Sequence, residues 1–297
     1  MRTVLRPWLL AWLLALPAHA QTVAESHQDL ASDAPEAWAM RYLAGATLMT
    51  SFGELAKPSP WRASIAAELG SIPALSEAQR QVGFAGSKTE DLNKSPAFGR
   101  LRLALGLPRD WVAELGYTPP VRIDGAKPRA LVAVAAGRRV VESGRFTLSL
   151  RALAQSGKVG GDITCPARLA GVTDPVANPY GCRAPSKDVF SSNYHGADAT
   201  LGWATGDWRW HASAGIARTR LAVQVDARVF DVNDRSRLDS RGNLRWFTAG
   251  VRRDLGERWS LAAEILYVPL EVRRPSGSAS RRDSLGSLRA QLRYVPD

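Results

Sequence analysis

Histidine, serine and aspartate are the residues of this sequence whose spacing could support hydrolytic chemistry. Beyond residue 20 the chain holds only His27, His195 and His211, and no two of them have the spacing of metal ligands. Since no cysteine stands beside a histidine, we expect no metal site. Ser213 follows His211 by two residues, and a histidine can activate a serine when a third group orients the imidazole. Asp198 follows His195 by three residues, which places the two side chains on opposite faces of a strand.

The first 20 residues indicate where the protein goes. Arg2 and Arg6 precede an apolar stretch at 8–16, and Ala18-His19-Ala20 has the small residues that a signal peptidase requires. We therefore predict a signal peptide at 1–20 and cleavage before Gln21, with a retained membrane anchor as the alternative.

Length and composition indicate a globular or β-barrel protein with one main domain. The chain has 297 residues, of which 45% are hydrophobic and 23% charged, and a net charge of +11. No second apolar run reaches the roughly 18 residues of a membrane-spanning helix. Cys165 and Cys182 are the two cysteines. In an oxidising compartment we expect them to form a disulfide, with two free thiols as the alternative.

From residue 61 onward apolar and polar residues alternate, which is the pattern of half-buried β-strands. In 287–294, for example, Leu288, Ala290 and Leu292 alternate with Arg289 and Gln291. The pattern predicts ten strands, at 61–70, 98–107, 111–117, 129–138, 145–153, 195–204, 208–216, 244–253, 259–268 and 287–294.

The connections between these strands alternate in length. The short ones are 108–110, 138–144, 205–207 and 254–258, and the long ones are 71–97, 119–128, 154–194, 217–243 and 269–286. Bacterial outer-membrane barrels have short periplasmic turns and longer external loops, so the short connections are assigned to the periplasmic side.

Aromatic residues recur at the starts of the strands that run away from the short turns. A soluble sandwich gives no reason for that placement, whereas a girdle of aromatic side chains marks a membrane interface. The predicted girdle consists of Trp61, Trp111, Phe146, Trp208, Trp210, Trp259 and, at the end of the last strand, Tyr294.

On these features, residues 61–297 resemble the broad class of Gram-negative outer-membrane β-barrel proteins. The resemblance implies an all-β fold, an antiparallel transmembrane β-barrel of about ten strands, assembled by the barrel-assembly machinery. Twelve strands are the alternative, if 40–50 and 219–230 both pair in the wall. Members of the class usually finish on an aromatic residue, whereas here Val295-Pro296-Asp297 follow Tyr294.

Residues 21–60 are expected to form a separate N-terminal segment that lies in the periplasm or plugs the barrel. Within it, 34–50 fits a short helix with Asp33 as the N-cap and Pro35 in the first turn. The same residues also fit a strand.

The inward-facing side chains of the predicted barrel are rich in charge. An arginine that faces lipid costs about 2–4 kcal/mol, so charged residues collect on the lumen side. Glu68, Glu114 and Glu264 are the counter-ions, and the arginines outnumber them. Two interpretations remain open: a plug of Arg–Glu pairs, or a narrow basic passage that favours anions. The predicted lumen-lining residues are Arg62, Glu68, Arg100, Arg102, Glu114, Arg145, Arg151, Arg209, His211, Arg252, Glu264, Arg289 and Arg293.

The leading functional hypothesis is a non-enzymatic outer-membrane protein, structural or passing small solutes, without a cofactor. The alternative is an outer-membrane enzyme acting on lipid or peptide. His211-x-Ser213 is similar to the His-x-Ser strand motif of lipid A deacylases, and an omptin-type protease would need acidic residues and histidine at the outer rim.

The expected partners are outer-membrane lipid and lipopolysaccharide, and not nucleic acid, while the oligomeric state stays open. Four arginines flanking one external loop are the predicted contacts for lipopolysaccharide phosphates. They are Arg273, Arg274, Arg281 and Arg282.

Overall fold

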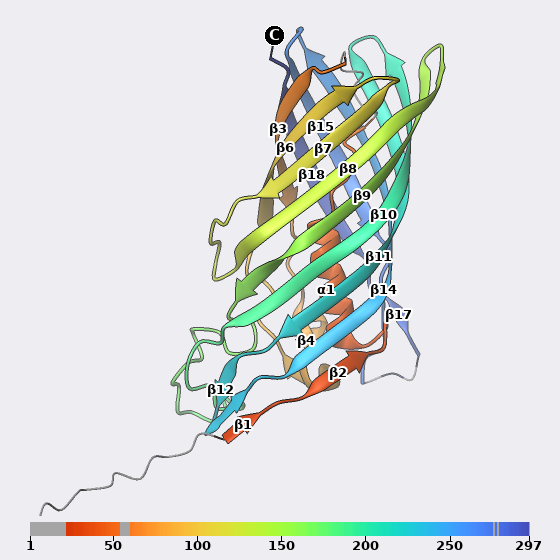
Figure 1. The fold of residues 1–297 in the computed structure, drawn as a ribbon. Helices are drawn as coiled ribbons and strands as arrows, with labels where there is room; N and C mark the ends of the chain where they lie inside the picture. Colours follow the sequence, from red (N-terminus) through yellow and green to blue (C-terminus); the bar gives the residue numbers. More distant parts are fainter. Residues whose placement is uncertain (1–21, 54–59, 276, 278, 297) are drawn as a thin grey trace, which may run out of the picture.

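The computed structural model describes residues 22–53, 60–275, 277 and 279–296. The predicted signal peptide, 1–20, lies outside these residues. Figure 1 shows a tall barrel with the C-terminal end at one rim and the N-terminal strands at the other. Among the described residues, no helix is long and apolar enough to span a membrane.

Ten antiparallel strands form a closed wall. In chain order they are β3 (Ala63–Ser71), β6 (Ala97–Leu107), β7 (Trp111–Thr118), β8 (Lys127–Ser143), β9 (Phe146–Gly161), β10 (Asp188–Thr205), β11 (Trp208–Gln224), β14 (Arg237–Leu255), β15 (Trp259–Val268) and β18 (Leu285–Tyr294). The wall closes because β18 pairs with β3 and β11 pairs with β14. The prediction of a ten-stranded antiparallel barrel is therefore confirmed.

The twelve-strand alternative is wrong for two physical reasons. Residues 40–50 lie inside the barrel, mostly in a helix, and do not pair with the wall. Residues 219–224 continue β11, and the next residues form a short strand in a separate small sheet.

Five neighbouring strands, β8 to β11 and β14, are much longer than the sequence pattern predicted. They have 16–19 residues each. β9, β10, β11 and β14 extend on the long-loop side, whereas the added residues of β8 lie mainly in its hairpin with β9 at the short-turn end (Figure 1). On the long-loop side the outward residues of these extensions, such as Lys158 and Arg241, are mostly polar, so apolar residues do not mark them as strands in the sequence. The predicted turn at 138–144 is likewise too long, because β8 and β9 are joined by Gly144 and Arg145 alone.

Most of the smaller elements lie at the long-loop end. They are β1 (Thr22–Ala24), β2 (His27–Leu30), α2 (Glu77–Arg80), β4 (Gln81–Val82), α3 (Gly83–Gly86), β5 (Lys88–Thr89), β12 (Ala227–Val229), β13 (Val232–Asp234), β16 (Glu271–Val272) and β17 (Arg281–Arg282). β2 runs parallel to the extension of β14, and β1 runs parallel to β13. The expected disulfide is present between Cys165 and Cys182, in the loop after β9.

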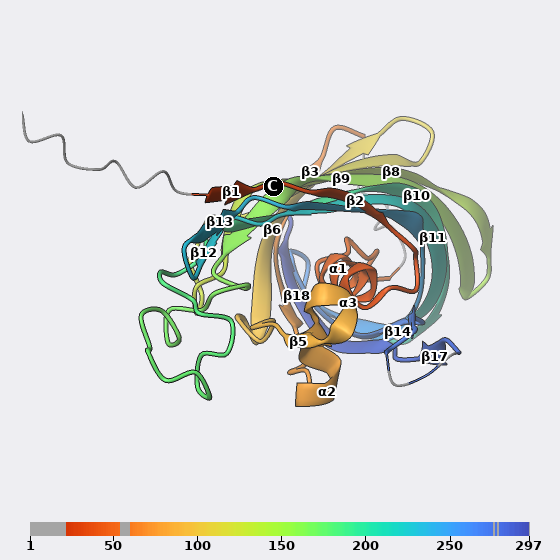
Figure 2. The same ribbon diagram turned by 90° about the horizontal axis from the view of Figure 1, so that it is seen from below.

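One helix, α1 (Pro35–Ala46), lies inside the barrel, where Figure 2 shows it enclosed by the ring of strands. Pro35 is in the first turn, as expected, but the N-cap is Ala34 rather than Asp33. The Asp33 carboxylate instead accepts hydrogen bonds from Ser280 and Arg273, at 2.7 and 3.3 Å. A tertiary contact has therefore taken the side chain that the sequence suggested for capping.

Candidate functional site

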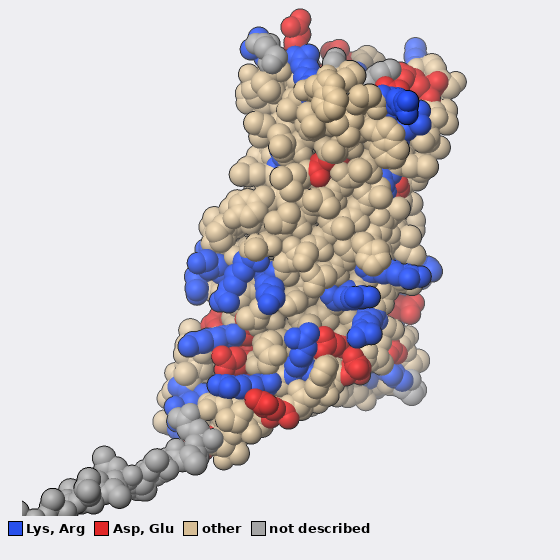
Figure 3. Space-filling model, viewed as in Figure 1, with Lys and Arg blue, Asp and Glu red and all other residues tan. Residues whose placement is uncertain are grey.

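The outer surface of the wall carries an apolar band. Outward-facing residues such as Leu69, Ile265 and Leu288 are 58–65% exposed, whereas their strand neighbours Glu68 and Glu264 are buried. Figure 3 shows a broad uncharged band, bordered on the long-loop side by lysine and arginine. A contiguous apolar band on the outside of a protein needs an apolar partner. A closed barrel with an even number of strands and such a band has the architecture of Gram-negative outer-membrane proteins.

The structure places the predicted girdle residues at one level of the wall, next to the short turns. Trp61, Trp111, Phe146, Trp208, Trp210 and Trp259 are 42–69% exposed. Tyr294 is half-buried, and its ring centroid lies 4.7 Å from that of Trp259.

The predicted lumen residues divide into two groups. Those in the central lumen are buried: Glu68, Arg100, Arg102, Glu114, Arg151, His211, Glu264 and Arg289. The others surround a cavity of about 520 Å³ at the short-turn end: Arg62, Arg145, Arg209, Arg252 and Arg293.

Asp198 is a central lumen residue that the sequence interpretation missed. It is buried on β10, and its Oδ2 lies 2.6 Å from Nη2 of Arg151. With Asp198 included, four carboxylates face Arg100, Arg102, Arg151 and Arg289, so this central group is balanced in charge. The alternation of Asp198 with the outward residues Ala197 and Ala199 is the signal that could have identified it.

Ion pairs link the four central arginines to the carboxylates of the wall. Glu68 lies 3.4–3.8 Å from Arg100, Arg102 and Arg289. Glu114 bridges Arg102 and Arg151, at 3.4 Å from the latter. Each of these charges is desolvated, so the pairs need further hydrogen bonds to offset the cost of burial.

The further hydrogen bonds come from the backbone of residues 45–50. Arg289 binds the carbonyls of Gly45, Ala46 and Leu48; Arg100 binds those of Thr47 and Leu48; Arg151 binds those of Met49 and Thr50; and Arg102 binds that of Thr50. Six consecutive carbonyl oxygens are thus held by four arginines of the wall. The first two belong to the last turn of α1, where a helix leaves its carbonyls unsatisfied and favours a cation.

Helix α1 itself is fixed by its aromatic residues. Nε1 of Trp38 donates to the carbonyl of Asp283 at 2.8 Å, and the Tyr42 hydroxyl donates to that of Pro73 at 2.9 Å. Both rings are buried in one apolar cluster with Leu266 of β15. The helix therefore contacts the wall through apolar packing as well as through its carbonyls.

Hydroxyl groups hold the chain that follows the helix. Thr50 donates to Glu264, and the amide of Met49 donates to the Tyr194 hydroxyl at 2.9 Å. Ser51 is 3.1 Å from the hydroxyl of Ser213. We name residues 35–53, comprising α1 and the extended chain after it, the lumen segment.

The candidate catalytic residues are not assembled for hydrolysis. His195 is exposed on the outer face, whereas Asp198 points into the lumen. His211 lies 3.4 Å from Glu264, and Ser213 bonds to Thr200 at 2.9 Å. Both residues are buried beneath the lumen segment. Within the described part of the chain, no group of three or more ligating side chains could hold a metal ion.

Two of the four loop arginines predicted to contact lipopolysaccharide are engaged within the protein. Arg273 binds Asp33, and Arg274 lies 2.8 Å from Asp283. Arg281 and Arg282 are exposed on β17.

A different basic patch lies on the outer wall, just beyond the apolar band. Its members are Arg218 and Arg220 of β11 and Arg241 and Arg245 of β14, all exposed. Arg220 and Arg241 are direct register partners. The sequence interpretation missed Arg218, Arg220 and Arg241 because it treated 217–243 as a loop. We name these four residues the outer arginine patch.

Comparisons with known proteins find barrels of similar fold at low similarity. No family model and no curated protein matches the sequence. Among solved structures, the chain is similar to OmpT, an outer-membrane protease from Escherichia coli, with 9% identity over 80% of this chain and 94% of that one, at a TM-score of 0.37. It is also similar to the attachment invasion locus protein Ail of Yersinia pestis, with 9% identity, 80% and 100% coverage and a TM-score of 0.30. A third is the toluene transporter TbuX of Ralstonia pickettii, with 9% identity, 80% and 90% coverage and a TM-score of 0.29. The three differ in role, and matches this distant assign no function to the chain.

Proposed function

We propose that this protein is a non-enzymatic outer-membrane barrel whose lumen is closed by its own N-terminal segment. The observation that carries the proposal is the binding of six consecutive carbonyls, from Gly45 to Thr50, by four arginines of the wall. These arginines are the residues that would line an anion passage. Their hydrogen bonds to the lumen segment favour the closed barrel over an open basic channel.

The energetics favour a stable closure. If the lumen segment left, the four guanidinium groups would lose their backbone acceptors while remaining in a narrow interior. Removing one partner of a buried charge costs about 3–5 kcal/mol. Departure of the whole segment would also expose the apolar surface of Trp38 and Tyr42, both of which are fully or almost fully buried.

The path of the chain supports the same function. β2 pairs with the long-loop extension of β14, and Trp61 donates its amide to Gly106 next to a short turn. Residues 31–53 therefore enter the lumen from the loop end, and the chain reaches the wall at the opposite end. With the loops at the cell surface, the N-terminal strands lie outside the membrane. The proposed role is that of a closed envelope protein that presents these strands and loops at the surface.

Single-channel recording in planar bilayers tests the closure. Purified wild-type protein should give no steady conductance. A double variant, Arg100→Gln with Arg289→Gln, loosens Gly45–Leu48 and should produce intermittent openings. Arg218→Gln with Arg220→Gln removes the same charge from the outer surface and should leave the bilayer silent. A steady, anion-selective conductance of the wild-type protein would refute the closed lumen.

A further inference from the structure

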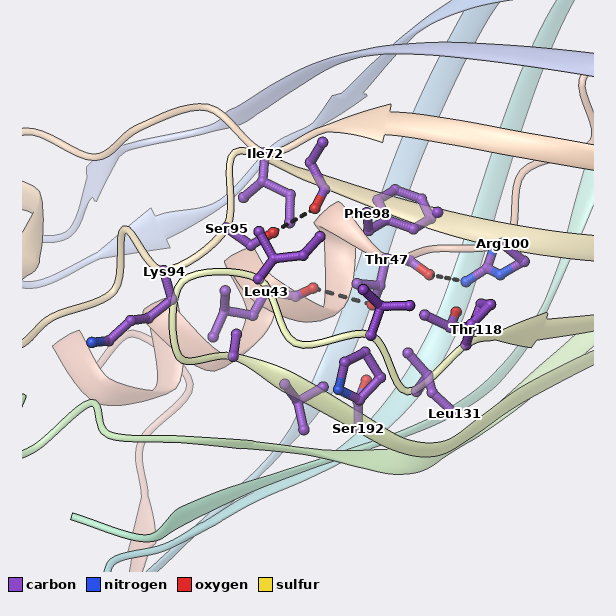
Figure 4. Close-up of a pocket in the computed structure, with 18 of the residues that line it drawn as sticks. Leu43, Thr47, Ile72, Lys94, Ser95, Phe98, Arg100, Thr118, Leu131 and Ser192 are labelled. Carbon is purple, nitrogen blue, oxygen red and sulfur yellow. Dashed lines mark hydrogen bonds between the residues drawn. The ribbon is translucent and has the colours of Figure 1, made fainter. Parts of the chain in front are cut away.

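An apolar cavity of about 420 Å³ lies in the wall where β7 ends (Figure 4). The pairing of β6 with β7 stops at Leu101–Tyr117, and that of β7 with β8 stops at Thr118–Leu131. Beyond these pairs, 97–100 and 127–130 have no β7 partner on their facing edges. The connection at 119–126 covers the resulting gap with Pro119, Val121 and Ile123.

The cavity passes through the wall. Leu69 and Leu101, which line it, point outward and are 64% and 52% exposed. Leu131 and Phe190, which also line it, point inward and are 2% and 4% exposed. Because alternate residues of a strand face opposite sides of the sheet, a cavity that contacts both sets connects the lipid-facing surface with the interior.

The inner end of the cavity reaches the lumen segment. Leu43 and Thr47 of this segment line it, and Figure 4 shows the Thr47 carbonyl bonded to Arg100. The cations at the lumen end and at the long-loop end of the cavity already have partners. Arg100 is held by Thr47 and by Gln155, and Lys94 lies 2.7 and 3.0 Å from Asp91 and Asp162. The interior therefore offers an apolar surface rather than a site for a charged group.

Two cations without such partners lie on the outer face of β8 and β9, next to residues that line the cavity. Arg129 and Lys158 are register partners on β8 and β9, and both are exposed. The Arg129 guanidinium packs over Gly160, which lines the cavity, since a Cβ at Gly160 would lie 3.1 Å from Nη2. Among the described residues, neither Arg129 nor Lys158 forms an ion pair. An anionic head bound here would leave its hydrocarbon tail facing the opening.

We propose that the cavity takes one acyl chain of lipid A, with the lipid phosphate held outside by Arg129 and Lys158. The volume is within the range of ligand sites, about 300–1,000 Å³, and the lining is apolar, as such a chain requires. The gap lies at the long-loop end, and the long loops of outer-membrane barrels are external. The lipid available at that level is the phosphorylated glycolipid of the outer leaflet. The inference rests on the proposed membrane insertion, but not on the closed lumen.

The test uses the full-length protein in phosphatidylglycerol vesicles that contain lipid A with a photoactivatable diazirine in one acyl chain. After irradiation, cross-linked residues are identified by mass spectrometry. We expect labelling of the inward residues Leu131 and Phe190 as well as of the outward residues Leu288 and Leu292. Labelling of the outward pair alone would overturn the inference while leaving membrane insertion intact. Absence of labelling at all four would contradict membrane insertion itself.

A matched pair of variants tests the entry route. Gly99 lines the mouth, and a Cβ there meets only ordinary contacts, with Leu69 Cδ2 at 3.6 Å. Gly99→Phe should cover the mouth and lower the labelling of Leu131 and Phe190 by about tenfold. Gly286→Phe places the same side chain on the outer face of β18, where nothing lies within 4 Å, and should leave labelling unchanged. Equal labelling of the two variants would overturn the proposed route.

A second pair tests the headgroup. Arg129→Gln with Lys158→Gln should weaken cavity labelling by the lipid A probe, whereas Arg281→Gln with Arg282→Gln, which removes the same charge from exposed residues of β17, should not. In a separate arm the diazirine is carried by phosphatidylglycerol. If that probe labels the cavity and an excess of lipid A does not displace it, the assignment to lipid A is overturned. Displacement by lipid A would support it.

Discussion

Arg151 and Asp198 face each other across β9 and β10, and the same nitrogen of Arg151 binds both Asp198 and the lumen segment. Nη2 of Arg151 lies 2.6 Å from Oδ2 of Asp198 and donates to the carbonyl of Met49 at 2.8 Å. The carboxylate thus orients the guanidinium that holds the lumen segment. An acidic residue of the wall therefore acts on the closure of the barrel without touching the segment.

This relationship predicts that Asp198→Asn weakens the whole barrel. The substitution keeps the shape of the side chain but removes the charge that offsets buried Arg151. Loss of one member of a buried ion pair should lower the free energy of unfolding by about 3 kcal/mol. The measurement is the temperature at which the compact band of the heat-modifiable protein converts to the extended one.

The matched control is Asp207→Asn in the exposed turn between β10 and β11. It removes the same charge where solvent already screens it, and the transition temperature should stay unchanged. If Asp198→Asn behaved like this control, the charge of Asp198 would have no part in holding Arg151.

The strand pattern could be predicted because a barrel wall separates two environments residue by residue. In β15, Leu261, Ala263 and Ile265 face outward while Ala262 and Glu264 are buried, as the alternation predicted. The extension of β14 could not be predicted in this way. Its outward residues, such as Asp239 and Arg241, are polar, and so are the inward Ser240 and Gly242, so the sequence shows little contrast between the two faces.

The charged lumen could be predicted, but the acceptors that bind its arginines could not. The alternation within each predicted strand indicates that Arg100, Arg151 and Arg289 face the lumen. Their acceptors are backbone carbonyls, and a carbonyl has the same chemistry at every residue, so nothing in the sequence marks Leu48 or Met49 as a partner. A search for acidic counter-ions could have identified Asp198, because the alternation within 195–204 places its side chain on the lumen face.

The disulfide predicts a local response to reduction. Cys165 and Cys182 lie in the loop between β9 and β10, and the backbone of Cys182 also forms an antiparallel β-bridge with Val229 of β12. Closing a loop of this length is worth about 3 kcal/mol in the chain-entropy account. Reduction should make 162–187 sensitive to protease while the compact, heat-modifiable form persists. Collapse of the barrel on reduction would contradict this separation, and alkylation of both thiols before reduction would contradict the bond itself.

Acid should release the contact between two external loops. Burial acts to raise the pKa of Asp162, but the hydrogen bond from the Ala167 amide and the Lys94 ammonium outweigh it, so the pKa lies below the usual 3.8. A carboxyl with a lowered pKa in the folded state stabilises that state above its unfolded pKa. The stabilisation is lost as the pH falls through the lowered value.

Hydrogen exchange measures this release. After correction for intrinsic rates, the amide of Ala167 should be protected at about pH 6 and should lose protection towards about pH 2, as Asp162 becomes protonated. Asp162→Asn should show reduced protection at both values, because it lacks the charge that Lys94 binds. Protection that stayed constant with pH in the wild-type protein would show that the ion pair contributes nothing.

The last prediction separates the two basic regions as lipopolysaccharide contacts. Arg220 and Arg241 lie side by side on the outer wall, where lipid phosphates would meet them, whereas Arg281 and Arg282 lie on β17 at the loop end. A cation near an anionic membrane surface contributes about 1 kcal/mol, and this contribution falls with salt. Arg220→Gln with Arg241→Gln should therefore reduce lipopolysaccharide binding by more than tenfold at low salt, roughly two such contributions. Arg281→Gln with Arg282→Gln removes the same charge from the loop and should have a much smaller effect. The measurement is the binding of purified lipopolysaccharide, titrated at low and high salt. A larger loss of binding for the β17 variant would show that lipopolysaccharide contacts β17 instead.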